Sequence, residues 1–106
     1  MTIKVTDSTL LSEVQKGITL VEFWAPWCGP CKMLGPVLEE LEEELAPKVK
    51  IAKLNIDENE IIANQLGIRS IPTMVLYQNG QPLERIVGYK PKEVLKDYLI
   101  KKIEDK

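Results

Sequence analysis

The sequence predicts an α/β fold, a central mixed β-sheet of about five strands flanked on both faces by about four helices. Residues 18–25 are apolar at nearly every position, which is typical of a central strand covered on both faces. Two later runs, residues 73–78 and 83–87, flank Asn79-Gly80, a strong hairpin signal because both residues tolerate positive φ. The element order βαβαβαββα implies parallel strands joined by crossover helices, followed by a final hairpin.

The first half of the chain predicts two strands and two helices. Residues 3–6 form a short strand, and either Asp7 or Ser8 can cap a helix that ends at Gly17. After the strand at residues 18–25, leucines recur at helical spacing and predict a long helix with one apolar face. These residues are Leu34, Leu38, Leu41 and Leu45.

The second half adds one strand and two helices to the hairpin. Residues 49–55 have the pattern of a strand. Asn59 can cap a short helix over residues 60–66, which Gly67 ends. The last helix starts near Pro91, because proline suits a first helical turn.

Composition and charge restrict the possible functions. The 106 residues suit one domain, residues 1–106, and nothing in them suggests more than a monomer. A net charge of −2 argues against binding to nucleic acid, which requires a basic surface. We expect no membrane contact, because no apolar run approaches the roughly 20 residues of a membrane span. The first residues lack the basic and apolar segments of a signal peptide, so we expect a cytoplasmic protein.

The only two cysteines, Cys28 and Cys31, lie two residues apart where a strand gives way to a helix. Disulfide exchange requires an accessible thiolate, and a helix N-terminus favours an anion. Cys28 lies at that end, whereas Cys31 falls in the first turn and is expected to be more enclosed. We therefore assign Cys28 as the attacking nucleophile and Cys31 as the resolving thiol.

Two other uses of this cysteine pair remain open. As a structural staple, such a short loop would contribute only about 2 kcal/mol, and a chain of this length does not need it. As a zinc site, the pair supplies two ligands where structural zinc takes four, and the chain has no histidine. We therefore favour redox chemistry, with no metal and no bound cofactor.

Five segments together resemble the thioredoxin family, in its bacterial form. Residues 23–32 (FWAPWCGPCK) resemble the active-site signature of that family. Further matches lie at residues 52–57, 71–73, 79–80 and 87–88, in the order in which the family has them. The resemblance covers essentially the whole chain and implies the thioredoxin fold.

The resemblance implies roles for residues near the cysteines. Burial should raise the pKa of Glu22, because the strand around it is apolar on both faces. In the family, the acid at this position, usually aspartate, exchanges a proton with the resolving cysteine, and a lysine like Lys53 lies nearby. Gly29 and Pro30 form a rigid turn that sets the distance between the sulfurs. This Gly-Pro pair also points to a reductant.

The resemblance also implies a surface that binds client proteins. The family keeps the proline at Pro72 in the cis form, packed against the cysteines. The backbone of the residue before it, here Ile71, pairs with an extended client segment. The family often has glycine where this chain has Ser70. The remaining residues of this apolar rim are Trp27, Val87 and Gly88.

The implied activity is the reduction of disulfides in client proteins. A thioredoxin reductase that uses NADPH and FAD would regenerate the dithiol. Clients of the family include ribonucleotide reductase, peroxiredoxins and methionine sulfoxide reductases. Two alternatives stay open at this stage. One is a binding module whose cysteines are idle, and the other is an oxidant or isomerase that runs the exchange in the opposite direction.

Overall fold

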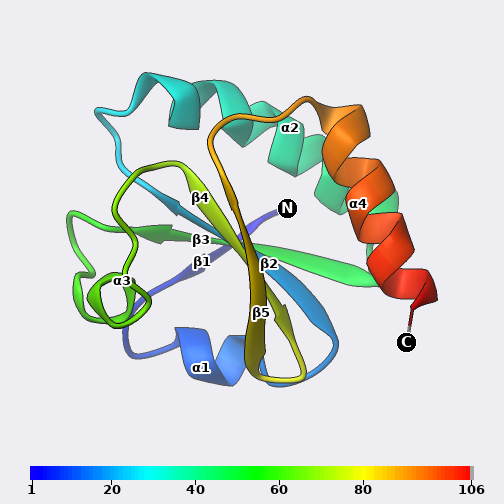
Figure 1. The fold of residues 1–106 in the computed structure, drawn as a ribbon, viewed down its shortest axis with the longest axis horizontal. Coiled ribbons are helices and arrows are strands. Elements are labelled where there is room, and N and C mark those ends of the chain that lie inside the picture. The colour runs from blue at the N-terminus through cyan, green and yellow to red at the C-terminus, as the bar shows by residue number, and fades with distance from the viewer. Residues whose placement is uncertain (106) are drawn as a thin grey trace.

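The computed structural model describes residues 1–105 and contains one five-stranded sheet and four helices (Figure 1). The strands are β1 (Ile3–Val5), β2 (Ile18–Trp24), β3 (Val49–Asn55), β4 (Thr73–Gln78) and β5 (Gln81–Val87). The helices are α1 (Leu10–Glu13), α2 (Gly29–Leu45), α3 (Ile61–Gln65) and α4 (Lys92–Glu104). Within residues 1–105, no helix is both long enough and apolar enough to cross a membrane.

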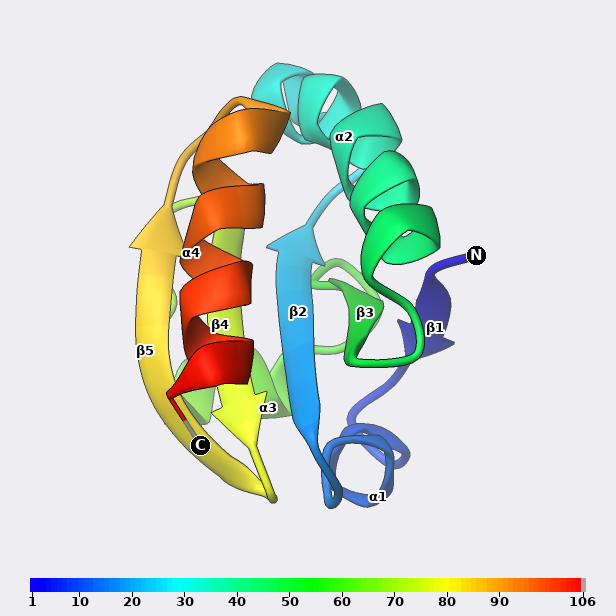
Figure 2. The same cartoon turned by 90° about the vertical axis from the view of Figure 1, so that its right-hand side faces the viewer.

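The sheet is mixed and has the strand order β1-β3-β2-β4-β5. Strands β1, β3 and β2 run parallel, while β4 is antiparallel to both β2 and β5. Helices α2 and α4 cover one face of the sheet, and α1 and α3 lie against the other (Figures 1 and 2). The predicted fold class is therefore confirmed.

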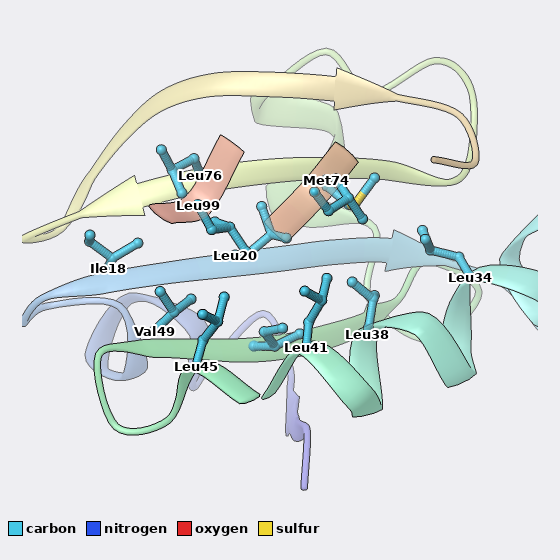
Figure 3. Close-up of a cluster of buried hydrophobic side chains, with 12 residues drawn as sticks. Ile18, Leu20, Leu34, Leu38, Leu41, Leu45, Val49, Met74, Leu76 and Leu99 are labelled. Carbon is cyan, nitrogen blue, oxygen red and sulfur yellow. The ribbon is translucent and has the colours of Figure 1, made fainter. Parts of the chain in front are cut away.

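The side chains of β2 alternate between two hydrophobic cores, as those of a strand covered on both faces must. Leu20 packs in the core beneath α2 and α4, which Figure 3 shows in close-up. Val21 and Phe23 pack in the core beneath α1 and α3. The leucines predicted to share one face of the long helix, at positions 34, 38, 41 and 45, all point into the first core.

The first helix is shorter than predicted. Helix α1 ends at Glu13, well before Gly17, and Thr9 rather than Asp7 or Ser8 stands at its N-terminus. The start moves because the Thr9 hydroxyl accepts from the Thr6 N–H at 2.9 Å and closes a separate turn. At the other end, the Gly17 N–H donates to Asn79 Oδ1 at 2.8 Å. Gly17, where the helix was expected to end, therefore bonds to the β4–β5 hairpin instead of to the helix.

Asp7 caps α3 instead of α1. Its two carboxylate oxygens accept from the backbone N–H groups of Ile61 and Ile62 at 3.1 and 3.0 Å. The predicted cap of this helix, Asn59, makes no capping bond, and its side chain bonds to Asp7 N and Asn55 O. Both side chains are able to cap a helix, but contacts between distant segments direct Asp7 to α3 and leave Asn59 without a capping role.

The other bounds lie close to the predicted ones. Strand β5 begins at Gln81, two residues before the predicted start, and includes Pro82. Proline fits there because β5 is an edge strand, where a missing N–H costs little. Asn79 and Gly80 have φ angles of 49° and 88°, as the hairpin signal requires.

Replacing a leucine at the interface of α2 with the sheet is expected to destabilise the protein strongly. Leu41 is fully buried, so Leu41→Ala leaves a cavity and should lower the free energy of unfolding by about 2–5 kcal/mol. The control is Leu11→Ala, because Leu11 is 60% exposed and its loss should cost less than about 0.5 kcal/mol. Urea unfolding of both variants measures the difference, and equal losses would contradict the packing described.

Candidate active site

The two cysteines form a disulfide at the point where the chain leaves β2 and enters α2. Cys28 is the N-cap of α2, and its Sγ atom accepts from the Cys31 N–H at 3.2 Å. The free N–H groups and the dipole at this helix end favour negative charge on that sulfur. Cys28 and Cys31 are 5% and 3% exposed, so both are buried, and the predicted contrast in enclosure is small.

The turn between the cysteines is built from Gly29 and Pro30, the first two residues of α2. Proline suits this position because the first N–H groups of a helix have no partner within the helix. A Cβ atom on Gly29 would meet no other atom within 4 Å, so space alone does not require glycine there. The local chemistry therefore explains Pro30 and leaves Gly29 without a steric reason.

The loop before β4 lies directly against Cys28. The Cys28 Sγ atom is 3.7 Å from the carbonyl oxygen of Ile71, and the Ile71–Pro72 peptide bond is cis, the isomer that the resemblance implies. The Pro72 carbonyl accepts from the Gly88 N–H at 2.8 Å, which ties this loop to the end of β5. Gly88 has a φ of 92°, a conformation that other residues rarely adopt, and Val87 beside it is 51% exposed.

Trp27 stands at the surface beside the disulfide, with 68% of its area exposed. Its Nε1–H donates to both carboxylate oxygens of Asp57, at 3.0 and 3.2 Å. Together with Ile71, the indole borders a groove of about 180 Å³, which we call the Trp27 groove. The rest of the groove is lined by Ile56, Glu60, Ala63, Asn64, Ile68 and Arg69.

Glu22 is fully buried in β2, as the sequence predicts, and by the alternation of the strand it shares a sheet face with Leu20, beneath α2 and α4. Neither of its carboxylate oxygens has a hydrogen-bond partner among residues 1–105. Burial raises the pKa of Glu22 to about 7, and the positive charge of Lys53 opposes that rise. The group can therefore exchange a proton near neutral pH.

Lys53 lies next to Glu22, on the neighbouring strand β3 and in direct register with it. Its ammonium nitrogen stands 4.6 Å from the centroid of the Trp24 ring, a cation–π contact. The two charged residues are thus close enough for Lys53 to influence the pKa of Glu22. They form no direct ion pair within the described part of the chain.

Sequence reasoning gave no role to two polar contributors to the site. Asp57 lies within the matched residues 52–57, but its bond to Trp27 joins positions 30 residues apart, which local patterns cannot reveal. Arg69 borders the Trp27 groove although nothing in its neighbourhood singles it out. Among the described residues, no group of three metal-binding side chains gathers that could hold a metal ion.

A disulfide that closes a single helical turn beneath an accessible rim can open and re-form by exchange with another thiol or disulfide. Together with the mixed sheet and its helices, it defines the class of thiol–disulfide oxidoreductases, enzymes that work with redox partner proteins.

Comparisons with known proteins agree with that class. The family model "Thioredoxin" matches residues 1–101. Thioredoxin from Bacillus subtilis (strain 168) is 48% identical over 99 residues, which cover 93% of this chain and 95% of the relative. Thioredoxins from Staphylococcus aureus strains Mu50 and N315 match with the same identity and coverage. The chain belongs to the thioredoxin family, and the reading of its cysteines as idle residues of a binding module is not favoured.

The buried carboxyl of Glu22 is expected to make stability depend on pH. Because its pKa is about 7 when folded and near 4.5 when unfolded, the folded protein holds this proton more tightly. Stability should therefore be greatest below the unfolded pKa and fall by about 2–3 kcal/mol as the pH rises from 5 to 8. Glu22→Gln removes the charge and should abolish most of this fall.

Urea unfolding of the oxidised protein between pH 5 and pH 8 measures this effect. This pH range excludes the titration of Glu39, Glu44 and Glu84, because their pKa values are lowered and they change charge at more acidic pH. If the parent and the Glu22→Gln variant lose the same stability across the window, Glu22 is not the group responsible.

Proposed function

We propose that this protein reduces disulfides in client proteins of the cytoplasm, acting as a monomer with a single domain, residues 1–106. The observation that carries the proposal is the disulfide at the N-terminus of α2, where the Cys28 sulfur accepts a backbone N–H. No bound cofactor takes part, because the electrons reside in the two thiols. The acidic balance of the chain gives no reason to expect nucleic acid as a partner, and a membrane has no role.

In the first step, the thiolate of Cys28 attacks one sulfur of a client disulfide. A bond forms between Cys28 and that sulfur, the client disulfide breaks, and the other client sulfur leaves as a thiolate that takes up a proton. The helix N-terminus supports this role, because its N–H groups and dipole stabilise the Cys28 thiolate. The turn of Gly29 and Pro30 keeps the second thiol within reach.

In the second step, Cys31 resolves the mixed disulfide. Its thiol passes a proton to the carboxylate of Glu22, and the resulting thiolate attacks the Cys28 sulfur. The bond between Cys28 and the client breaks, and the client leaves fully reduced while the internal disulfide forms. Glu22 suits this role because its pKa of about 7 lets it accept and return a proton near neutral pH. Lys53 helps to set that pKa.

Client proteins bind around the cysteines mainly through backbone contacts. The Ile71 carbonyl lies 3.7 Å from the Cys28 sulfur, so an extended segment that pairs with this backbone would bring its own sulfur to Cys28. Pro72 holds that loop against the disulfide. Trp27, the neighbour of Cys28 in the sequence, and Val87, the neighbour of Gly88, are both exposed and would add to a binding surface tolerant of many sequences.

Family membership suggests the redox partners. We propose that a thioredoxin reductase dependent on NADPH and FAD returns the disulfide to the dithiol. Ribonucleotide reductase, peroxiredoxins and methionine sulfoxide reductases are the client classes that we propose.

The roles of the two cysteines can be separated by trapping. Cys31→Ser should accumulate a covalent adduct with a disulfide-containing client, because the first step proceeds and the second cannot. Non-reducing electrophoresis or mass spectrometry of the intact adduct measures its yield. Cys28→Ser is the matched control and should give no adduct. Adducts of equal yield from the two variants would show that the roles are wrongly assigned.

The direction of the exchange is set by the reduction potential of the cysteine pair. For a general reductase we expect a value below about −240 mV, on the reducing side of glutaredoxins. Equilibration with defined thiol–disulfide buffers, followed by acid quenching and alkylation, gives this value. A potential well above that of the glutathione pool would identify an oxidant or isomerase and refute the proposed direction.

A further inference from the structure

We propose that Asn59 is a positioning residue that holds Trp27 and α3, which both line the Trp27 groove, in place and so sets the affinity for client proteins. This inference rests on the proposed function, in which clients bind beside Trp27. The side chain of Asn59 bonds to Asp7 and Asn55 and to neither cysteine. Its effect is therefore on client binding and not on the thiol–disulfide exchange.

Asn59 is a buried polar residue whose side chain joins two separate segments. It is 8% exposed, and its Oδ1 atom accepts from the Asp7 N–H at 3.0 Å. Its Nδ2 group donates to the Asn55 carbonyl at 3.2 Å. The amide therefore ties the turn after β1 to the end of β3.

One branch of this network leads from Asn59 to Trp27. The side chain of Asn55 accepts from the Asp57 N–H at 2.9 Å, which fixes the turn after β3. The carboxylate of Asp57 in that turn accepts the indole N–H at 3.0 Å. Trp27 is largely exposed, so this bond is the polar contact that orients its ring. Movement of the Asn55–Asp57 turn would therefore move the ring.

The other branch leads from Asn59 to α3. Asp7, whose N–H bonds to Asn59, caps this helix through the N–H groups of Ile61 and Ile62. Ala63 and Asn64 of the same helix line the Trp27 groove. One buried amide thus links the indole of Trp27 with α3, both of which line the groove.

Loss of the Asn59 amide should loosen this groove without altering the cysteines. The Asp7 N–H and the Asn55 carbonyl would lose their partner, and both turns would relax to find others. Cys28 and Cys31 are held instead by their bond to one another, by α2 and by the contact with Ile71. Client affinity should fall while the intrinsic reactivity of the dithiol is unchanged.

The test compares a protein disulfide with a small disulfide as substrates of Asn59→Ala. With insulin as the protein substrate, KM should rise about three- to tenfold, a change within the range that the loss of one or two hydrogen bonds produces, while kcat changes by less than about twofold. The rate with 5,5′-dithiobis(2-nitrobenzoate), which is too small to span the groove, should also stay within about twofold of the parent. The reduction potential should be unchanged.

A second variant tests whether Asn59 acts through Trp27. Asp57→Ala removes the last bond of the network at an exposed position and should raise the insulin KM by itself. If both residues act on the same ring, the double variant should raise KM no further than the more severe single variant. Effects that multiply would show that the residues act independently and would overturn the proposal.

Two controls separate positioning from a general loss of stability. Leu99→Ala weakens the core on the other face of the sheet and should lower the melting temperature without raising the insulin KM. If Asn59→Ala fails to fold, Asn59→Ser, which keeps a hydroxyl group, is measured in its place. A folded variant with the parent KM would overturn the inference, whereas failure of the parent itself to reduce insulin would refute the proposed function instead.

Discussion

The burial of β2 on both faces and along both edges is the constraint on which the rest of the structure depends. Two helices cover each face, and β3 and β4 pair with its edges, so the strand cannot shift without disrupting two cores. The chain leaves this strand directly into the turn that carries Cys28. The position of the cysteine pair is thereby set by the most constrained segment of the fold, although the pair itself lies at the rim.

The same burial creates the chemistry of Glu22. A carboxylate with no hydrogen-bond partner is costly inside a protein, and the chain lowers this cost by holding the group protonated until the pH approaches about 7. Lys53 on the next strand moderates the effect, with its ammonium resting on the Trp24 ring. The buried carboxyl therefore lowers the stability of the protein at neutral pH and above, where the group would have to ionise inside the protein.

The cysteine pair and the surface around it draw on different parts of the chain. The cysteines depend on α2 and on the carbonyl of Ile71, all close to one end of β2. The surface around them comes from segments far apart in sequence, joined by polar bonds such as those of Asp57 and Gly88.

Local patterns in the sequence were sufficient for the sheet, the helices and the cysteine pair. The double-sided apolar run of β2, the leucine spacing of α2 and the Asn79-Gly80 turn can each be recognised from residues that lie close together in the sequence. The partners of Asp7 and Asn59 could not be found in this way, because either side chain is able to cap the helix that follows it. Which donors they meet depends on how β1 and β3 bring distant turns together, and so does the bond between Asp57 and Trp27. The residue type determines whether a side chain can donate or accept a hydrogen bond. The packing of distant segments determines which group it bonds to.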